Sequence, residues 1–276
     1  MEPITVLMKP KNVAKLEVLL PCANTKVTVS GTYFNDECDL YSNVATSKSS
    51  KIRILSSMAY SKIISPPKEI DTYEKFLDLC TIEDTDAVLL GILGASFGNL
   101  YDNTQYCPYC GFLNEHTINF SSALKMNVYE GKKFSIVTKE VLEKLENMEN
   151  DVYALLKYPT LNEAIRTEEL LETTGKGGVV TSPNFIKIVE YLKEFRFVTN
   201  SGGETKINKE KDHMSFFATM RAMQSINRKQ LIRVINKEFS EYNISLNTEI
   251  SCKSCKKKFE DSVKPTQLFF REISES

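Results

Sequence analysis

Two short stretches, CPYC at 107–110 and CKSC at 252–255, decide how this chain is organised. Each is a Cys-x-x-Cys pair, and 141 residues (111–251) separate one pair from the other. A Cys-x-x-Cys turn directs two thiolates at one metal ion, and a structural zinc site takes four ligands in a tetrahedron. The two stretches therefore predict one four-cysteine site, with Zn²⁺ as a structural cofactor and Cys107, Cys110, Cys252 and Cys255 as its ligands.

The long separation does not oppose a shared metal. The entropy cost of closing a loop grows only with the logarithm of its length, and zinc binding in such sites contributes about 10–16 kcal/mol. Four thiolates leave no open coordination position, which disfavours catalytic zinc. They also leave the site negatively charged, and the lysines of the second pair, Lys253, Lys256, Lys257 and Lys258, are placed to offset that charge.

Two alternatives stay open for the cysteine pairs. One is a degenerate site that folds without metal. The other is redox chemistry, because CPYC has a glutaredoxin-like form, but such a motif opens a helix, whereas the following EHTINF at 115–120 alternates like a strand. His116 lies in that strand and is a further candidate ligand, although we expect a strand histidine here to face solvent.

The composition limits the class of protein. The chain has 276 residues, enough for one large domain or two modest ones, with 42% hydrophobic and 26% charged residues. Its formal net charge of −1 excludes a chain that binds polyanions over its whole surface. No apolar run reaches the roughly 18–20 residues that span a bilayer, and the N-terminus does not read as a signal peptide. We expect an intracellular product with no membrane contact.

Cysteine usage points the same way. Seven cysteines are an odd number, which argues against a disulfide framework. Cys22, Cys38 and Cys80 stand apart in apolar or mixed surroundings. A free cysteine usually behaves as a small hydrophobic residue, so we expect these three to be buried thiols.

The first hundred residues predict a mixed unit. Strands are expected within 1–32, and helices over 36–47, 50–64, 71–80 and 81–98. In the last helix, Thr81 and Asp84 fit a capping box and Gly98 fits the stop. Gly91 and Gly94 lie inside it and each costs about 1 kcal/mol relative to Ala, so close packing against another backbone is their expected reason.

The region between the cysteine pairs predicts mostly helices, over 135–150, 158–172, 183–195, 213–223 and 227–243. A polar, mobile loop is expected at 199–212, and a strand at 245–250 before CKSC. The fold class expected is α+β: an N-terminal mixed domain (1–106), then a zinc-ribbon-like module (107–276) made of 107–120 and 246–270 and interrupted by a long helical insertion (135–243).

The candidate enzyme motifs in this sequence lack the residues or the spacing that catalysis requires. TTGKGG at 173–178 lacks the spacing and the Ser or Thr of a phosphate loop. The two histidines, His116 and His213, are far apart in the sequence. No residue set suits general acid–base or nucleophilic catalysis, so we expect no enzymatic activity.

Several of these stretches together resemble a known family, the baseplate hub and hub assembly proteins of T-even-type bacteriophages. The similar stretches are LLP at 19–21, FNDECDLYSNVATSK at 34–48, TIEDTDAVLLGILGASFG before CPYCG, KYPTLNEA at 157–164, LIRVINKEFSEYNISLNTEI before CKSC, and the closing LFF. The resemblance implies a structural or assembly protein at the central hub of a contractile tail baseplate, made in the host cytoplasm and carried in the virion. Its implied partners are other baseplate and hub proteins, among them the spike, the tape measure or wedge components. Cys107, Cys110, Cys252 and Cys255 map onto the paired cysteine turns of that family.

A second function stays open beside this one. A zinc-ribbon accessory protein that binds nucleic acid would account for the lysines around the second pair. That patch is short and carries two acidic residues, Glu260 and Asp261, so we expect nucleic-acid binding to be the weaker interpretation.

Overall fold

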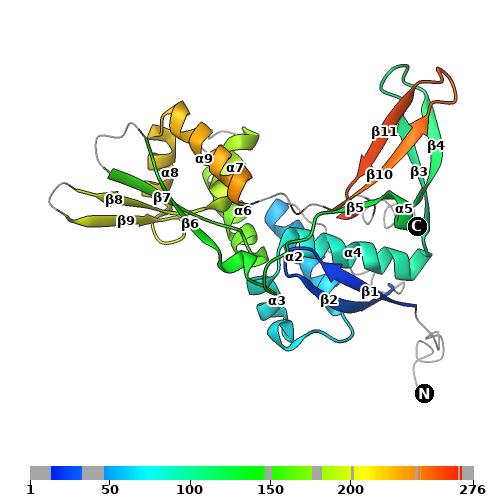
Figure 1. Ribbon diagram of the computed structural model, residues 1–276, viewed down its shortest axis with the longest axis horizontal. Coiled ribbons are helices and arrows are strands. Elements are labelled where there is room, and N and C mark those ends of the chain that lie inside the picture. The colour runs from blue at the N-terminus through cyan, green and yellow to red at the C-terminus, as the bar shows by residue number, and fades with distance from the viewer. Residues whose placement is uncertain are drawn as a thin grey trace.

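The computed structural model describes residues 14–32, 47–146, 151–175, 182–199, 202–239, 242, 244–266 and 268. Within them the chain forms three parts, named here the N-terminal body, the ribbon and the insert. The ribbon and the insert lie toward opposite ends of the long axis, and the N-terminal body lies along the lower edge of the view (Figure 1). The expected helix over 36–47 lies outside the described residues.

The N-terminal body is a two-stranded hairpin and helices around one buried helix. The elements are β1 (Lys15–Leu20), β2 (Thr25–Ser30), α2 (Lys48–Ser61), the short η2 (Lys68–Ile70), α3 (Tyr73–Leu79) and α4 (Ile82–Phe97). Helix α4 is apolar on most sides, with Val88, Leu89, Ile92 and Leu93 at most 1% exposed. A helix of that kind belongs in a core, and the hairpin and α2 pack around it.

The ends of α4 agree with the sequence prediction. Both hydrogen bonds of the Thr81–Asp84 capping box form, and Gly98 ends the helix with a φ of 87°. A positive φ at this place favours glycine. The boundaries of this central helix are therefore set by local chemistry.

The interior glycines of α4 are also explained. A Cβ at Gly91 would overlap Val18 Cγ2 and lie 2.9 Å from Val29 Cγ2, whereas one at Gly94 would meet only Leu16 Cδ1 at 2.9 Å. The hairpin thus packs most closely on the helix backbone at Gly91. Close packing is confirmed, but the partners are the Val18 and Val29 side chains and not another backbone.

Gly91→Ala is expected to lower the free energy of unfolding by up to about 2 kcal/mol, since overpacking costs about 1–3 kcal/mol and the gain in helix propensity returns about 1 kcal/mol. Gly94→Ala is the matched control, because the Leu16 methyl can rotate away, and the gain in helix propensity should raise the free energy of unfolding by up to about 1 kcal/mol. Urea unfolding of both variants measures the difference. Equal effects at the two positions would contradict this packing.

The ribbon is built from two hairpins that are distant in sequence. The first pairs β3 (Leu100–Tyr106) with β4 (Leu113–Asn119), and the second pairs β10 (Ile244–Ser251) with β11 (Lys258–Val263). Short elements α5 (Phe120–Ala123) and β5 (Leu124–Met126) follow β4, and β5 pairs with β10. At the ribbon base, Tyr101, Ile118 and Leu246 join the hydrophobic core of the N-terminal body.

The insert contains a four-stranded antiparallel sheet in the order β6-β7-β8-β9. Its elements are η3 (Ile136–Thr138), β6 (Glu140–Lys144), β7 (Asp151–Lys157), α6 (Leu161–Gly175), α7 (Pro183–Tyr191), β8 (Leu192–Val198), β9 (Glu204–Asn208), α8 (His213–Ala222) and α9 (Ser225–Glu238). Tyr158, Phe195, Phe216 and Phe239 belong to its own hydrophobic core.

This sheet corrects the predicted helical insertion. The expected helix over 135–150 is wrong: its described part forms η3 and β6. Val137, Val141 and Leu145 repeat every four residues, and an even spacing fits one face of a strand as well as one face of a helix. Pairing with β7 selects the strand.

Two further boundaries differ from the sequence prediction. The helix expected over 183–195 ends at Tyr191, where β8 begins. The polar loop expected at 199–212 contains β9, whose polar sequence ETKIN suits an exposed edge strand beside β8. The helices expected over 158–172 and 213–223 correspond to α6 and α8. The helix expected over 227–243 corresponds to α9, which ends earlier, at Glu238.

The predicted α+β fold class is confirmed. Cys22 and Cys80 are fully buried, as expected, and Cys38 lies outside the described residues. Within the described parts of the chain, no helix has the length and apolar character needed to cross a membrane.

Candidate metal centre

The four predicted cysteines meet at the tip of the ribbon. CPYC lies in the loop 107–112 between β3 and β4, closed by the pair Tyr106↔Leu113. In this loop the Cys107 N–H donates to the Phe112 carbonyl at 2.8 Å, and the Gly111 N–H donates to the Cys107 carbonyl at 2.9 Å. Gly111 has a φ of 71°, which is the left-handed turn that a glycine supplies at least cost.

The second turn repeats the first position by position. CKSC lies in the loop 252–257 between β10 and β11, closed by Ser251↔Lys258. The Cys252 N–H donates to the Lys257 carbonyl at 3.0 Å, and the Lys256 N–H donates to the Cys252 carbonyl at 3.0 Å. Lys256 adopts the left-handed conformation, φ 62°, that Gly111 has in the first loop. Two hairpin loops of the same length and hydrogen bonding thus face one another.

The sulfur geometry fits a tetrahedral zinc ion. The ligand atoms of Cys107, Cys110, Cys252 and Cys255 all lie within 4.8 Å of one another. Cys107 Sγ lies 3.7 Å from Cys255 Sγ, and Cys110 Sγ lies 3.6 Å from Cys252 Sγ. With Zn–S distances near 2.3 Å, a regular tetrahedron has edges of about 3.8 Å. The residues present therefore have the right chemistry and the right spacing for Zn²⁺.

The surroundings favour thiolate at Cys252. Burial opposes its ionisation, but the backbone N–H groups of Cys255 and Ser254, with the neighbouring thiols, lower the pKa of Cys252 to about 6. Lys257 Nζ lies 4.8 Å from the centre of the Tyr109 ring, a cation–π contact that joins the two loops.

Asn114 is a supporting residue that the sequence analysis missed. It is 1% exposed, its Nδ2 lies 3.7 Å from Cys252 Sγ, and its Oδ1 accepts a hydrogen bond of 2.9 Å from the Lys253 N–H. This side chain from the first hairpin therefore positions the second loop. The second hairpin has no equivalent asparagine, so neither spacing nor repetition marks this residue in the sequence.

Asn114→Ala is expected to weaken zinc affinity by about 10–100-fold, as changes to residues behind metal ligands generally do. Competition with a chromophoric chelator measures this affinity. Asn119→Ala, at the exposed far end of the same strand, is the control and should leave it unchanged. If the Asn114 variant binds zinc as tightly as the wild type, Asn114 does not position the second loop for metal binding.

Below the sulfur atoms, a second polar layer joins the hairpins. Asp261 Oδ2, on β11, accepts a 2.8 Å hydrogen bond from Asn103 Nδ2 and lies 3.1 Å from His116 Nε2. The His116 side chain is 11% exposed. The prediction that His116 faces solvent is therefore wrong: the pleat of β4 turns it toward β11, onto a buried carboxylate. It lies outside the group of metal-ligating side chains.

The redox interpretation loses its structural basis. A thioredoxin-like motif needs the first cysteine at the start of a helix, and CPYC lies at the tip of a β-hairpin. TTGKGG likewise does not form a phosphate loop: its first part completes α6, which ends at Gly175, and residues 176–178 lie outside the described residues.

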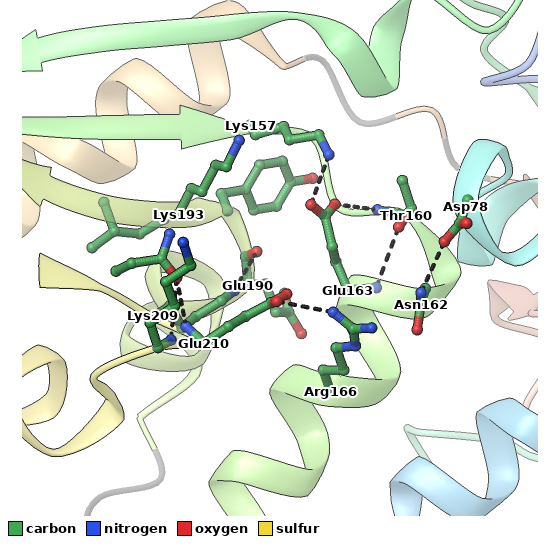
Figure 2. A pocket seen from close by; sticks show the side chains of 14 residues that line it. Asp78, Lys157, Thr160, Asn162, Glu163, Arg166, Glu190, Lys193, Lys209 and Glu210 are labelled. Atoms are coloured by element: carbon green, nitrogen blue, oxygen red, sulfur yellow. Dashed lines mark hydrogen bonds and ion pairs between the residues drawn. The ribbon is translucent and has the colours of Figure 1, made fainter.

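A second feature, a polar pocket of about 500 Å³, lies where α6 meets the sheet of the insert. Figure 2 shows that its charged side chains point at one another. Lys157 pairs with Glu163 at 2.7 Å, and Arg166 pairs with Glu210 at 2.9 Å. Its charges thus largely neutralise one another.

The deepest cation of this pocket supports the fold. Lys209 Nζ donates to Thr167 Oγ1 at 2.9 Å and to the Val189 carbonyl at 2.8 Å, near the end of α7. Burial lowers the pKa of Lys209 to about 8. A cation is favoured near the C-terminus of a helix, so Lys209 ties β9 to α6 and α7.

The fold and the tip together define a class: an α+β protein with a split, four-cysteine ribbon around a large insert. The sequence profile of the T4 bacteriophage base plate protein family matches residues 16–271. The chain belongs to this family, and it is a baseplate protein of a T4-type phage. No curated protein and no solved structure matches it significantly.

Proposed function

We propose that this protein is a structural or assembly component of the central hub of a contractile tail baseplate, without enzymatic activity. The observation that carries the proposal is the family match over residues 16–271. In this role the chain associates with other baseplate proteins, with the spike, the tape measure and wedge components as the candidates next to the hub. It is made in the host cytoplasm and carried in the virion.

We propose further that Zn²⁺ on Cys107, Cys110, Cys252 and Cys255 holds the ribbon together. The support is the sulfur spacing and the matched pair of loops. The ion brings no reaction of its own, because four thiolates leave no open position. Apart from base packing, polar contacts of Asp261 and Asn114 and one cation–π contact connect the two hairpins. The ion adds a strong link at the tip, and so holds both ends of the intervening chain in place under load.

The domain division belongs to the same proposal, with an N-terminal domain and a ribbon module that carries the insert at 135–243. The boundary expected at 106/107 would separate β3 from β4, so we place it before Leu100. The separate hydrophobic cores of the N-terminal body and the insert support it. Cys22 packs in the core of the insert, so the division is one of folding units in contact.

The location is tested with purified tails. Quantitative mass spectrometry should find the chain at a fixed ratio to other baseplate proteins, and chemical cross-links should join it to hub proteins. Tails that lack the chain while infected cytoplasm contains it would contradict a virion component and leave only an assembly role. Cross-links confined to the outer wedges would contradict the hub.

Nucleic-acid binding is the second candidate function, and a specific feature favours it. Exposed Lys253, Lys256 and Lys257 adjoin exposed Tyr109 at the ribbon tip, and basic side chains beside aromatic ones suit single-stranded nucleic acid. Binding of an oligonucleotide that weakens with salt and with Lys256→Glu/Lys257→Glu would establish it. No binding at low salt would exclude it.

A further inference from the structure

A groove in the insert has a composition unlike the polar pocket. It lies between the first turns of α7 and α9, with a volume of about 530 Å³. Its floor is apolar, made by Phe185, Ile188 and the half-buried Ile232. Figure 1 shows α7 and α9 next to one another on the insert. A groove of this size and lining can take the side chains of a bound peptide.

Every charged residue that lines the groove is a cation: Arg228, Lys229 and Arg233. Arg228 donates to Ser225 Oγ at 3.2 Å, and none of the three pairs with a carboxylate among the described residues. The sequence carries the same bias, because residues 213–237 contain five Lys or Arg and no Asp or Glu. In a chain of net charge −1, this is a local concentration of positive charge.

Two helix ends add to this charge. Residues from the first turns of both α7 and α9 line the groove, and the N-terminus of a helix carries partial positive charge. Ser182 Oγ accepts from the Phe185 N–H at the start of α7, whereas Gln224 provides no side-chain cap for α9. The α9 N-terminus therefore keeps N–H donors that a carboxylate of a partner can occupy.

We propose that the α7–α9 groove is a docking site for an acidic segment of a partner protein, one that also carries apolar side chains. The apolar floor takes the apolar side chains, and the cationic rim with the α9 N-terminus takes the carboxylates. In choosing baseplate proteins as the source of the segment, the inference rests on the proposed function. The positive charge and the apolar floor are properties of the groove itself and do not depend on the proposed function.

Nucleic acid fits this groove less well than a polypeptide. Proteins that bind single-stranded nucleic acid without sequence preference stack the bases on exposed aromatic rings. Phe185 is the aromatic residue of the groove lining, and it is only 5% exposed, so it offers no such ring.

The test uses the full zinc-loaded chain and two probes. One is an array of overlapping peptides from the other tail proteins of the same phage. The other is a designed helical peptide with Leu on one face and Glu on the other. Affinities by fluorescence anisotropy are compared for wild type, Arg228→Glu/Arg233→Glu, and the control Lys68→Glu/Lys211→Glu, which makes the same change in net charge at exposed positions elsewhere. Oligothymidine is a third ligand.

The array should select acidic peptides that contain apolar residues. The groove variant should raise the Kd of the array hits and of the designed peptide at least about tenfold, with the control unchanged. Ile232→Ala, which keeps the charge, should also weaken binding. Selected peptides without an acidic bias, or equal weakening by the control, would overturn the proposal, as would oligothymidine binding that depends on Arg228 and Arg233 while no peptide binds.

The outcome is separable from that of the proposed function. A chain found in purified tails whose groove binds neither peptide probe refutes the docking site and leaves the baseplate role standing. A chain absent from tails whose groove still binds the designed peptide refutes the virion role and leaves the docking site standing.

Discussion

Loss of zinc is expected to unfold the ribbon tip while the N-terminal body stays folded. The apolar contacts that hold the tip are few: Ile250 and Phe259 pack beside the cysteines. Zinc binding contributes about 10–16 kcal/mol, far more than two buried side chains at about 1.5–3 kcal/mol each. The ribbon base instead packs into the main core, so unfolding should stop there.

Elemental analysis of the purified chain should give one zinc, and Cys252→Ser should remove it. Ser254→Ala, in the same loop but exposed, is the matched control and should keep the metal. In the Cys252 variant, hydrogen exchange should accelerate in the tip half of the ribbon, 103–116 and 248–261, and stay slow at the ribbon base and in α4. If the wild-type chain contains no metal and its ribbon amides still exchange slowly, the proposal that zinc holds the ribbon together is contradicted. A site that folds without metal is then favoured.

A native thiol count cannot replace this measurement. Burial raises the pKa of both Cys22 and Cys80, and thiolate is the reactive form. These two thiols would therefore react slowly whether or not metal protects the others. Zinc release on titration with a mercurial reagent reports the four ligands directly.

Asp84→Ala is expected to lower the free energy of unfolding by about 3–5 kcal/mol. Asp84 is fully buried, and its Oδ1 accepts from the N–H groups of Cys22 at 2.9 Å and Ala23 at 3.1 Å. Its Oδ2 accepts from the Thr81 N–H at 3.0 Å. The side chain thus joins the β1–β2 turn to the start of α4, and its loss leaves three buried donors without an acceptor.

The pKa of Asp84 depends on both its burial and its hydrogen bonds. Burial raises this pKa to about 7, although the three N–H groups act to lower it. Asp84→Asn keeps one acceptor and should recover roughly half of the loss. Asp71→Ala, which removes an exposed carboxylate paired with Lys75, should change stability by less than about 1 kcal/mol. Urea unfolding compares the three variants, and an Asp84→Ala loss no larger than that of Asp71→Ala would contradict the account.

Much of the local structure could be predicted from the sequence because its causes are local. The capping box of α4 and the stop at Gly98 each depend on residues within a few positions of the helix ends. The meeting of the four cysteines could be predicted despite 141 intervening residues, because a structural zinc ion takes four ligands and each Cys-x-x-Cys turn offers only two. Each Cys-x-x-Cys turn can also be recognised in the sequence without knowledge of the other.

Other features were decided only by the tertiary structure. The segment of β6 has a spacing that fits a helix or a strand, and β9 is polar enough for a loop; their pairing with β7 and β8 selects the sheet. His116 faces Asp261, and Asn114 faces Cys252, because two hairpins far apart in the chain pack face to face. The sequence by itself determined which four cysteines meet and where the central helix lies. Strand pairing and the contacts between hairpins join residues that no local pattern connects, and for that reason only the folded chain decided them.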